Sequence, residues 1–151
     1  MAVYGKRKVL LRGSDFVVQV ETGVAGEVIK PGYLVDGVLT IMKHASAGGA
    51  APKTIALERD EMGSGIDDTY SNDPATPDAA YAVGDAVKVA NCHSGIQFTG
   101  WVGSGQDITA NDRLESAGNG LFREGSTVIL ARAIETLGLV LEETKCKMEW
   151  F

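Results

Sequence analysis

Short runs of alternating apolar and polar residues, rich in valine, isoleucine and aromatic side chains, recur along most of the chain. The apolar positions do not follow the spacing of an amphipathic helix, and most runs end at Gly, Asn or Asp, which favour turns. The pattern therefore predicts a mainly β protein, a small barrel or sandwich with tight turns and long loops. The predicted strands are Asp15–Glu21, Tyr33–Met42, Thr54–Leu57, Ala86–Val89, Gly95–Val102, Thr127–Ile134 and Leu137–Leu141.

A short frame recurs four times: an apolar residue, two others, Gly or Asn, two more residues, and a second apolar residue. The copies are Ile29–Val35, Tyr81–Val87, Ile108–Leu114 and, more loosely, Phe122–Val128. The fourth positions are Gly32, Gly84, Asn111 and Gly125. Gly and Asn tolerate positive φ, so each copy is interpreted as a structural turn leading into a strand, with a positive φ or close packing at this position. Chance recurrence of a common turn is the alternative.

The remaining segments predict the organisation of the chain. Residues 60–80 are mostly Gly, Asp, Ser, Pro and Ala, which indicates a long surface loop, and residues 71–80 have the character of an insertion. A helical turn is expected only near Glu58–Met62, because Gly63 and Gly65 would end it. We expect residues 1–14 to form an N-terminal arm and residues 15–151 to form one β domain.

Charge is distributed unevenly along a chain whose formal net charge is −6. Lys6, Arg7, Lys8 and Arg12 cluster near the start, whereas residues 58–85 are mostly acidic. This asymmetry fits a protein that presents one end to an acidic partner, although a solvated basic terminus is the simpler alternative. The overall acidity argues against a nucleic-acid partner. No apolar run approaches the roughly 20 residues of a membrane span, and no signal pattern is present, so we expect synthesis in the cytoplasm without membrane association.

The sequence contains no recognisable catalytic or metal-binding constellation. Cys92 and Cys146 are expected to be free thiols, and they do not combine with His44 and His93 in a zinc-site spacing. The loop acids Asp67, Asp68, Asp73 and Asp78 do not form a calcium-binding loop. Nucleophile-elbow and phosphate-binding glycine motifs are absent. The sequence therefore predicts a non-enzymatic protein without a cofactor or a metal.

An ordered series of short motifs lies between Ile55 and Thr136. They are Ala56–Glu58 (ALE), Gly65–Tyr70 (GIDDTY), Tyr81–Val89 (YAVGDAVKV), Gly105–Ala110 (GQDITA), Leu114–Gly120 (LESAGNG) and Ala131–Glu135 (ARAIE). In this order they resemble the head decoration, or capsid cement, proteins of tailed bacteriophages. Each motif alone indicates only a local turn, but together, in this order, they span more than half of the chain.

This resemblance implies a β-tulip or barrel-like module with a hairpin at Leu114–Gly120. It also implies that the protein assembles as a homotrimer on the outer surface of the capsid. There it would bind the major capsid protein, bridge its subunits and stabilise the expanded shell. Residues 71–80 and the tail beyond Leu137 depart from the family pattern.

The first dozen residues are the predicted docking segment. Lys6, Arg7, Lys8 and Arg12 can pair with an acidic capsid surface. Val3, Tyr4, Val9 and Leu10 can add a β-strand to an exposed edge of the partner. We expect this arm to make little contact with the protein's own core. The alternative is that it forms a strand of the protein's own sheet.

A second hypothesis is a carbohydrate- or host-binding β module on the virion surface. Its stacking platforms would be Trp101, Tyr70 and Tyr81. Exposure of these rings on loops would favour the binding module, whereas their burial would favour the cement role.

Overall fold

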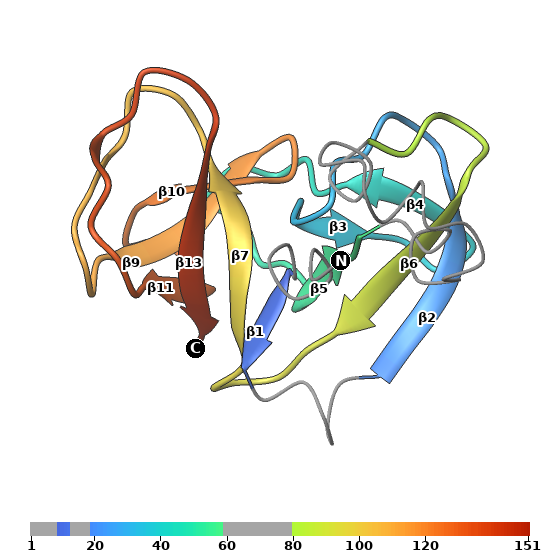
Figure 1. Ribbon diagram of the computed structural model, residues 1–151, viewed down its shortest axis with the longest axis horizontal. Helices are drawn as coiled ribbons and strands as arrows, with labels where there is room; N and C mark the ends of the chain where they lie inside the picture. The colour runs from blue at the N-terminus through green and yellow to red at the C-terminus, as the bar shows by residue number, and fades with distance from the viewer. Residues whose placement is uncertain (1–8, 13–18, 59–79) are drawn as a thin grey trace, which may run out of the picture.

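The computed structural model describes residues 9–12, 19–58 and 80–151, and all the regular elements in these ranges are β-strands (Figure 1). In order they are β1 (Leu10–Arg12), β2 (Gln19–Ala25), β3 (Val35–Asp36), β4 (Thr40–Lys43), β5 (Thr54–Ala56), β6 (Ala86–Asn91), β7 (Gln97–Val102), β8 (Asp107–Ile108), β9 (Arg113–Gly118), β10 (Leu121–Glu124), β11 (Ala131–Ala133), β12 (Gly138–Leu139) and β13 (Thr144–Trp150). The predicted mainly β fold class is confirmed.

One sheet closes on itself and forms what we call the large barrel. Its strand order is β1-β7-β10-β9-β11-β13, and β13 also pairs with β7, so the last strand returns to the second. The closing pair is antiparallel and runs from Thr144 opposite Val102 to Glu149 opposite Gln97. On its other side β7 meets β10 where Phe122 lies opposite Val102. The ring is therefore continuous, with β1 added beside β7.

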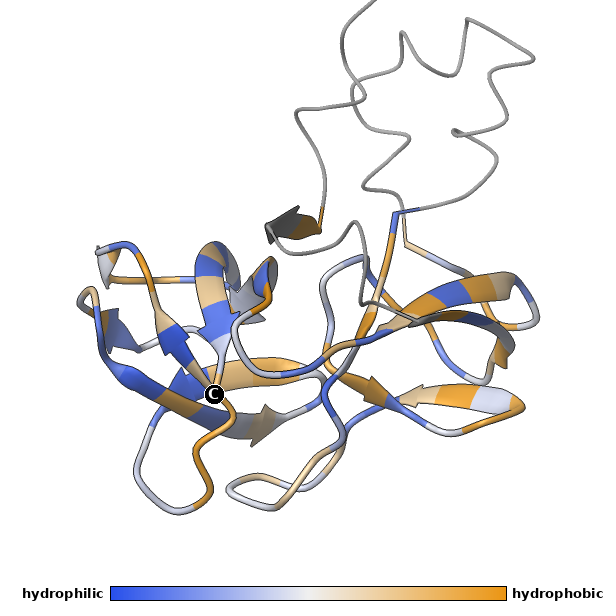
Figure 2. Ribbon diagram, turned by 90° about the horizontal axis from the view of Figure 1, so that it is seen from below, coloured by the Kyte–Doolittle hydropathy of each residue, from blue (hydrophilic) through white to orange (hydrophobic). Residues whose placement is uncertain are grey.

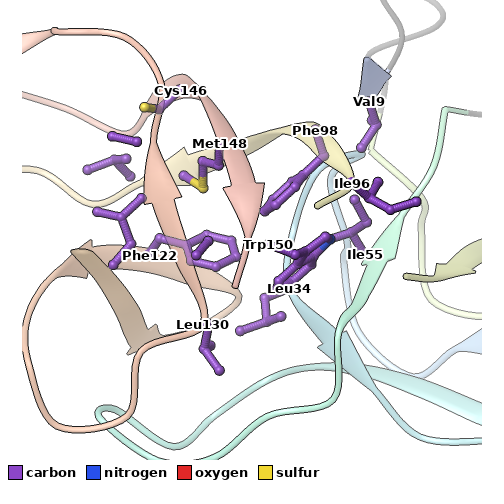
Figure 3. Packing of buried hydrophobic residues seen from close by; sticks show 14 of the residues in the cluster. Val9, Leu34, Ile55, Ile96, Phe98, Phe122, Leu130, Cys146, Met148 and Trp150 are labelled. Carbon is purple, nitrogen blue, oxygen red and sulfur yellow. The ribbon is translucent and has the colours of Figure 1, made fainter. Parts of the chain in front are cut away.

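Three aromatic rings lie in the core of the large barrel, among aliphatic side chains. The Phe98 and Trp150 rings stack with centroids 4.4 Å apart, and Phe122 meets Trp150 edge-on at 6.0 Å (Figure 3). These rings and Met148 are almost fully buried because residues alternate in and out along β7, β10 and β13. Figure 2 shows the same alternation as changes between hydrophilic and hydrophobic colour along the strands of the half that carries the C-terminus. Such ring pairs add about 0.5–1.5 kcal/mol to the stabilisation gained from burial.

The second sheet, β3-β4-β2-β6-β5, curls into what we call the small barrel. A single bridge between Leu34 and Ile55 joins the residue before β3 to β5 and nearly closes this sheet. The core inside is mainly aliphatic and includes Ile29, Ile41 and Val87. It also contains Tyr81, whose hydroxyl donates a 2.8 Å hydrogen bond to the carbonyl of Leu57.

The two barrels lie side by side and share apolar contacts (Figure 1). Leu34, Ile55 and Ala90 belong to the small barrel, yet they are part of the buried cluster around Trp150. The β9–β10 turn is tied to the small barrel by hydrogen bonds, since Leu34 N donates to Gly120 O at 2.9 Å and Gly120 N donates to His44 O at 3.0 Å. The shared core makes one structural unit of the described residues.

The strand predictions were correct in part. Tyr33–Met42 was wrong as a single strand, because the chain reverses at Gly37, whose φ is +106°, and forms the β3–β4 hairpin. Val38 and Leu39 are therefore 78% and 82% exposed at the hairpin tip. Within Thr127–Ile134 only β11 is a strand, and within Leu137–Leu141 only β12 is one. The strand predictions also omitted β1, β8, β9, β10 and β13.

Several expectations concern residues outside the described ranges. β2 begins at Gln19 and continues to Ala25, and residues 15–18 of the predicted Asp15–Glu21 strand lie outside the described residues. The expected helical turn after Glu58 and nearly all of the predicted loop over residues 60–80 also lie outside them.

Candidate interaction surface

The four turn positions do not share one backbone geometry. Gly32, Gly84 and Asn111 have φ values of +95°, +92° and +77°, so they adopt the left-handed conformation that the repeat requires. Gly125 is not among the residues with positive φ. A Cβ at this position would overlap the side chain of Glu115, so Gly125 is a site of close packing instead.

Residues 9–12 correct the expectation for the N-terminal arm. Val9 is buried in the large-barrel cluster, Leu10 packs against the same cluster, and β1 pairs with β7. Thr99 N donates a 2.7 Å hydrogen bond to Val9 O. The expectation of little contact with the protein's own core was therefore wrong for these residues. Val3, Tyr4, Lys6, Arg7 and Lys8 lie outside the described residues.

The predicted aromatic platforms are not brought together on the surface. Tyr81 is only 1% exposed and lies in the core of the small barrel. Trp101 is half-buried on β7, and Tyr70 lies outside the described residues. Burial of Tyr81 removes one of the three rings on which the second hypothesis depends.

Trp101 is instead the centre of a cluster where the two barrels meet. Its indole N–H donates a 2.8 Å hydrogen bond to Pro31 O, and its ring meets that of Tyr33 edge-on. The Lys30 and Lys145 ammonium groups lie 4.9 Å and 5.5 Å from the Trp101 ring centroid, within the range of cation–π attraction.

Glu143 completes the Trp101 cluster. Its carboxylate accepts a 2.9 Å hydrogen bond from the Tyr33 hydroxyl and lies 3.7 Å from Lys30 Nζ. Burial of the Tyr33 phenol, and secondarily its contacts with Glu143, raise the pKa of Tyr33 above its ordinary value. The hydroxyl therefore remains a protonated donor to Glu143 at neutral pH.

A polar row crosses four strands on the outside of the large barrel. Gln97 on β7 lies opposite Glu149 on β13, Glu149 lies opposite Arg132 on β11, and Arg132 lies opposite Arg113 on β9. Glu149 Oε1 accepts hydrogen bonds from Arg132 Nε and Nη2 at 3.0 Å and 2.8 Å, and Arg132 Nη1 donates to Asn111 Oδ1. The guanidinium group of Arg132 is therefore held in one orientation.

Two contacts that pair a buried ionisable side chain with a more exposed one have structural roles. Glu115 is buried and accepts hydrogen bonds from Thr127 N at 2.9 Å and Arg123 Nε at 2.9 Å, and these contacts lower the pKa of Glu115. His44 is buried with its Nδ1 2.8 Å from an Asp36 carboxylate oxygen. Both contacts fix loops to strands.

The potential metal ligands do not converge. Across residues 9–12, 19–58 and 80–151, no three His, Cys, Asp or Glu side chains gather in a way that could hold a metal ion. Cys92 and Cys146 are free thiols, and burial raises their pKa values to about 11 and about 12. Among the described residues, no helix has the length and apolar character required to cross a membrane.

The strand predictions missed β13, which places two lysines and a glutamate on the outer surface of the large barrel. Polar and apolar residues alternate strictly through β13, with Lys145, Lys147 and Glu149 facing out and Cys146, Met148 and Trp150 buried. This alternation is visible in the sequence and would have identified the strand.

The described chain is thus a mainly β protein built from two joined barrels, with a charged outer surface centred on β13. No protein-family model matches it, and no curated protein matches it. Among solved structures, the head fiber gp8.5 N base of bacteriophage phi29 is similar, with a TM-score of 0.55 and 12% sequence identity. The similarity covers 89% of this chain and 95% of that chain. At this level of identity the comparison establishes a shared fold.

Proposed function

We propose that this protein is a non-enzymatic structural protein of a bacteriophage virion that binds the outside of the capsid. In this proposal it is made in the bacterial cytoplasm and contacts the major capsid protein. It bridges neighbouring capsid subunits and so stabilises the expanded shell.

The observation that carries the proposal is the likeness of fold to a phage head fiber base over nearly the whole of both chains. The ordered motifs from Ala56 to Glu135 independently resemble phage head decoration proteins. The two lines of support have different origins, because one depends on backbone geometry and the other on local sequence. The buried position of Tyr81 favours this role over a carbohydrate-binding module.

The proposed mechanism consists of binding alone and requires no covalent step. A protein that binds the assembled, expanded shell more tightly than free subunits shifts the equilibrium toward the shell by mass action. Contacts to several subunits at once strengthen binding through effective concentration, even when each contact is weak. A homotrimer would multiply these contacts further, and we propose that state on the capsid.

The test uses empty expanded capsids assembled from the major capsid protein of the same phage. Purified protein is added, and binding is measured by cosedimentation and by calorimetric melting of the capsids. We expect saturable binding, a higher melting temperature of the shell, and extra density on its outer surface in electron cryomicroscopy. Absence of saturable binding would reject the proposal.

The same images test the homotrimer. Three-fold symmetric density above the shell is expected, whereas single copies away from any symmetry axis would reject the trimer. Light scattering of the free protein then shows whether the trimer exists before docking. A glycan-binding array provides the test of the carbohydrate-binding alternative.

A further inference from the structure

Basic side chains gather on one outer face of the large barrel. Trp101 lies opposite Lys145, and Thr99 lies opposite Lys147, so these side chains lie on the same face as the row from Gln97 to Arg113. We define the basic face by six residues: Lys30, Trp101, Arg113, Arg132, Lys145 and Lys147.

This face has a charge opposite to that of the whole protein. Five of the 14 basic residues of the chain lie on it, together with three of the 20 acidic ones, Glu135, Glu143 and Glu149. The chain as a whole carries a net charge of −6. A local excess of positive charge on an acidic protein orients it toward a negatively charged partner and disfavours other orientations.

Several groups on the face are held in place before any partner binds. Lys30 lies over Trp101 and pairs with Glu143, and Arg132 is fixed by Glu149. Ordered side chains lose less conformational entropy on binding. Arg113, Lys145 and Lys147 are the exposed members, and the two lysines project side by side from alternate positions of β13.

The backbone places β1 next to this face. Arg12 pairs in register with Gln97, the first residue of the polar row. The described part of the N-terminal segment, β1, therefore lies beside the polar row in the sheet.

We propose that the basic face is the surface through which this protein docks on an acidic patch of the capsid's outer protein surface. This inference rests on the proposed function and specifies its contact. Ionic contacts around the half-buried indole of Trp101 provide orientation and a fast association rate, with a strong dependence on salt. The exposed Val20, Val24 and Met42 of the small barrel are neutral, so they do not offer this charge complementarity.

The test is a charge reversal with a matched control. The face variant is Lys145→Glu/Lys147→Glu, and the control is Lys53→Glu/Lys88→Glu on the small barrel, which changes the net charge by the same amount. Both are measured for capsid binding at several salt concentrations. We expect the face variant to bind about tenfold more weakly or worse, with a flatter salt dependence, while the control loses much less.

Near-ultraviolet circular dichroism and melting curves check that each variant is folded. If the double reversal does not fold, Lys147→Gln removes one exposed charge and is expected to weaken binding by a smaller factor. Equal binding by the folded face variant and the wild-type protein would overturn the inference and leave the proposed function intact. Failure of the wild-type protein to bind capsids would overturn both the inference and the proposed function. Equal losses of capsid affinity in the face and control variants would overturn the specific role of this face.

Discussion

The two barrels are closed in different ways. In the large barrel β13 pairs with β7 over six residue pairs, and the core contains a cluster of three aromatic rings. In the small barrel one bridge, Leu34 to Ile55, and a few backbone hydrogen bonds connect the two ends of the sheet. The difference indicates that the large barrel is the more stable support, and it is the barrel that carries the basic face. A docking surface benefits from such a support because its charged groups keep their spacing.

The two barrels also depend on one another for stability, because they share buried residues. Leu34 and Ile55 close the small barrel and at the same time contact the core of the large one. We therefore expect a single cooperative unfolding transition in which damage to either core destabilises both barrels.

The largest expected effect comes from Trp150→Ala. This side chain is fully buried between Phe98 and Phe122, so its loss should reduce the free energy of unfolding by about 3–5 kcal/mol. Urea denaturation followed by circular dichroism measures the change. The adjacent Phe151 is 45% exposed, and Phe151→Ala is the matched control with an expected cost below about 1 kcal/mol. Equal losses of unfolding free energy in the two variants would mean that the buried aromatic cluster stabilises the fold no more than an exposed ring does.

A pair of glycine substitutions tests the junction between the barrels. Both Gly32 and Gly84 have positive φ, so alanine at either position should cost about 1–2 kcal/mol in backbone strain. At Gly32 the added Cβ would also meet Thr99 O at 2.9 Å, whereas at Gly84 it would meet nothing within 4 Å. Gly32→Ala should therefore lower the melting temperature clearly more than Gly84→Ala. The reverse order would contradict the packing of Gly32 against the large barrel.

Glu115→Gln is expected to cost about 1–2 kcal/mol, because glutamine keeps an acceptor for Thr127 N but loses the charge that binds Arg123. The pKa of Glu115 is lowered in the folded state, so its contribution is present above the unfolded value of about 4.3 and is lost as pH falls through the lower folded value. The difference in stability between wild type and variant should therefore shrink in acid. Urea titrations between neutral and acidic pH measure it, and a constant difference would contradict the ion pair.

The smallest effect concerns thiol reactivity. Burial raises the pKa of Cys146, on the closing strand β13, to about 12, and that of Cys92 to about 11. Both thiols should react slowly at neutral pH, and Cys92, which is only half-buried, should react first. Mass spectrometry after timed alkylation measures the two rates separately. Faster modification of Cys146 would indicate that the β7–β13 pairing opens more readily than its length suggests.

Local signals in the sequence predicted much of the fold but not its closure. The strand within Gly95–Val102 was found because its residues are rich in β-formers and alternate in part, and Gly84 because its turn chemistry is local. Pairing of β13 with β7 depends on residues about forty-five positions apart, a distance at which single-sequence patterns carry no information on partners. Val9 was assigned to an arm because nothing in its neighbours reveals that it fits the core around Phe98.

The candidate surface was harder to predict than the strands. The basic residues near the N-terminus form a visible cluster in the sequence, whereas Lys30, Arg113 and Lys145 come from three distant segments and meet only in the folded sheet. Only the alternation within β13 could have indicated two neighbouring lysines on one face.

The closed strand order of the large barrel has a consequence for crowding. An open sheet exposes unpaired backbone groups at its margins, and these can template fibrils or the exchange of strands between molecules. The described ring from β7 through β13 leaves little such margin. The marginal strands, β1 beside the large barrel and β3 and β5 of the small barrel, contain only 3, 2 and 3 residues. The fold can therefore be packed at high density, copy beside copy, with little tendency to aggregate through its backbone.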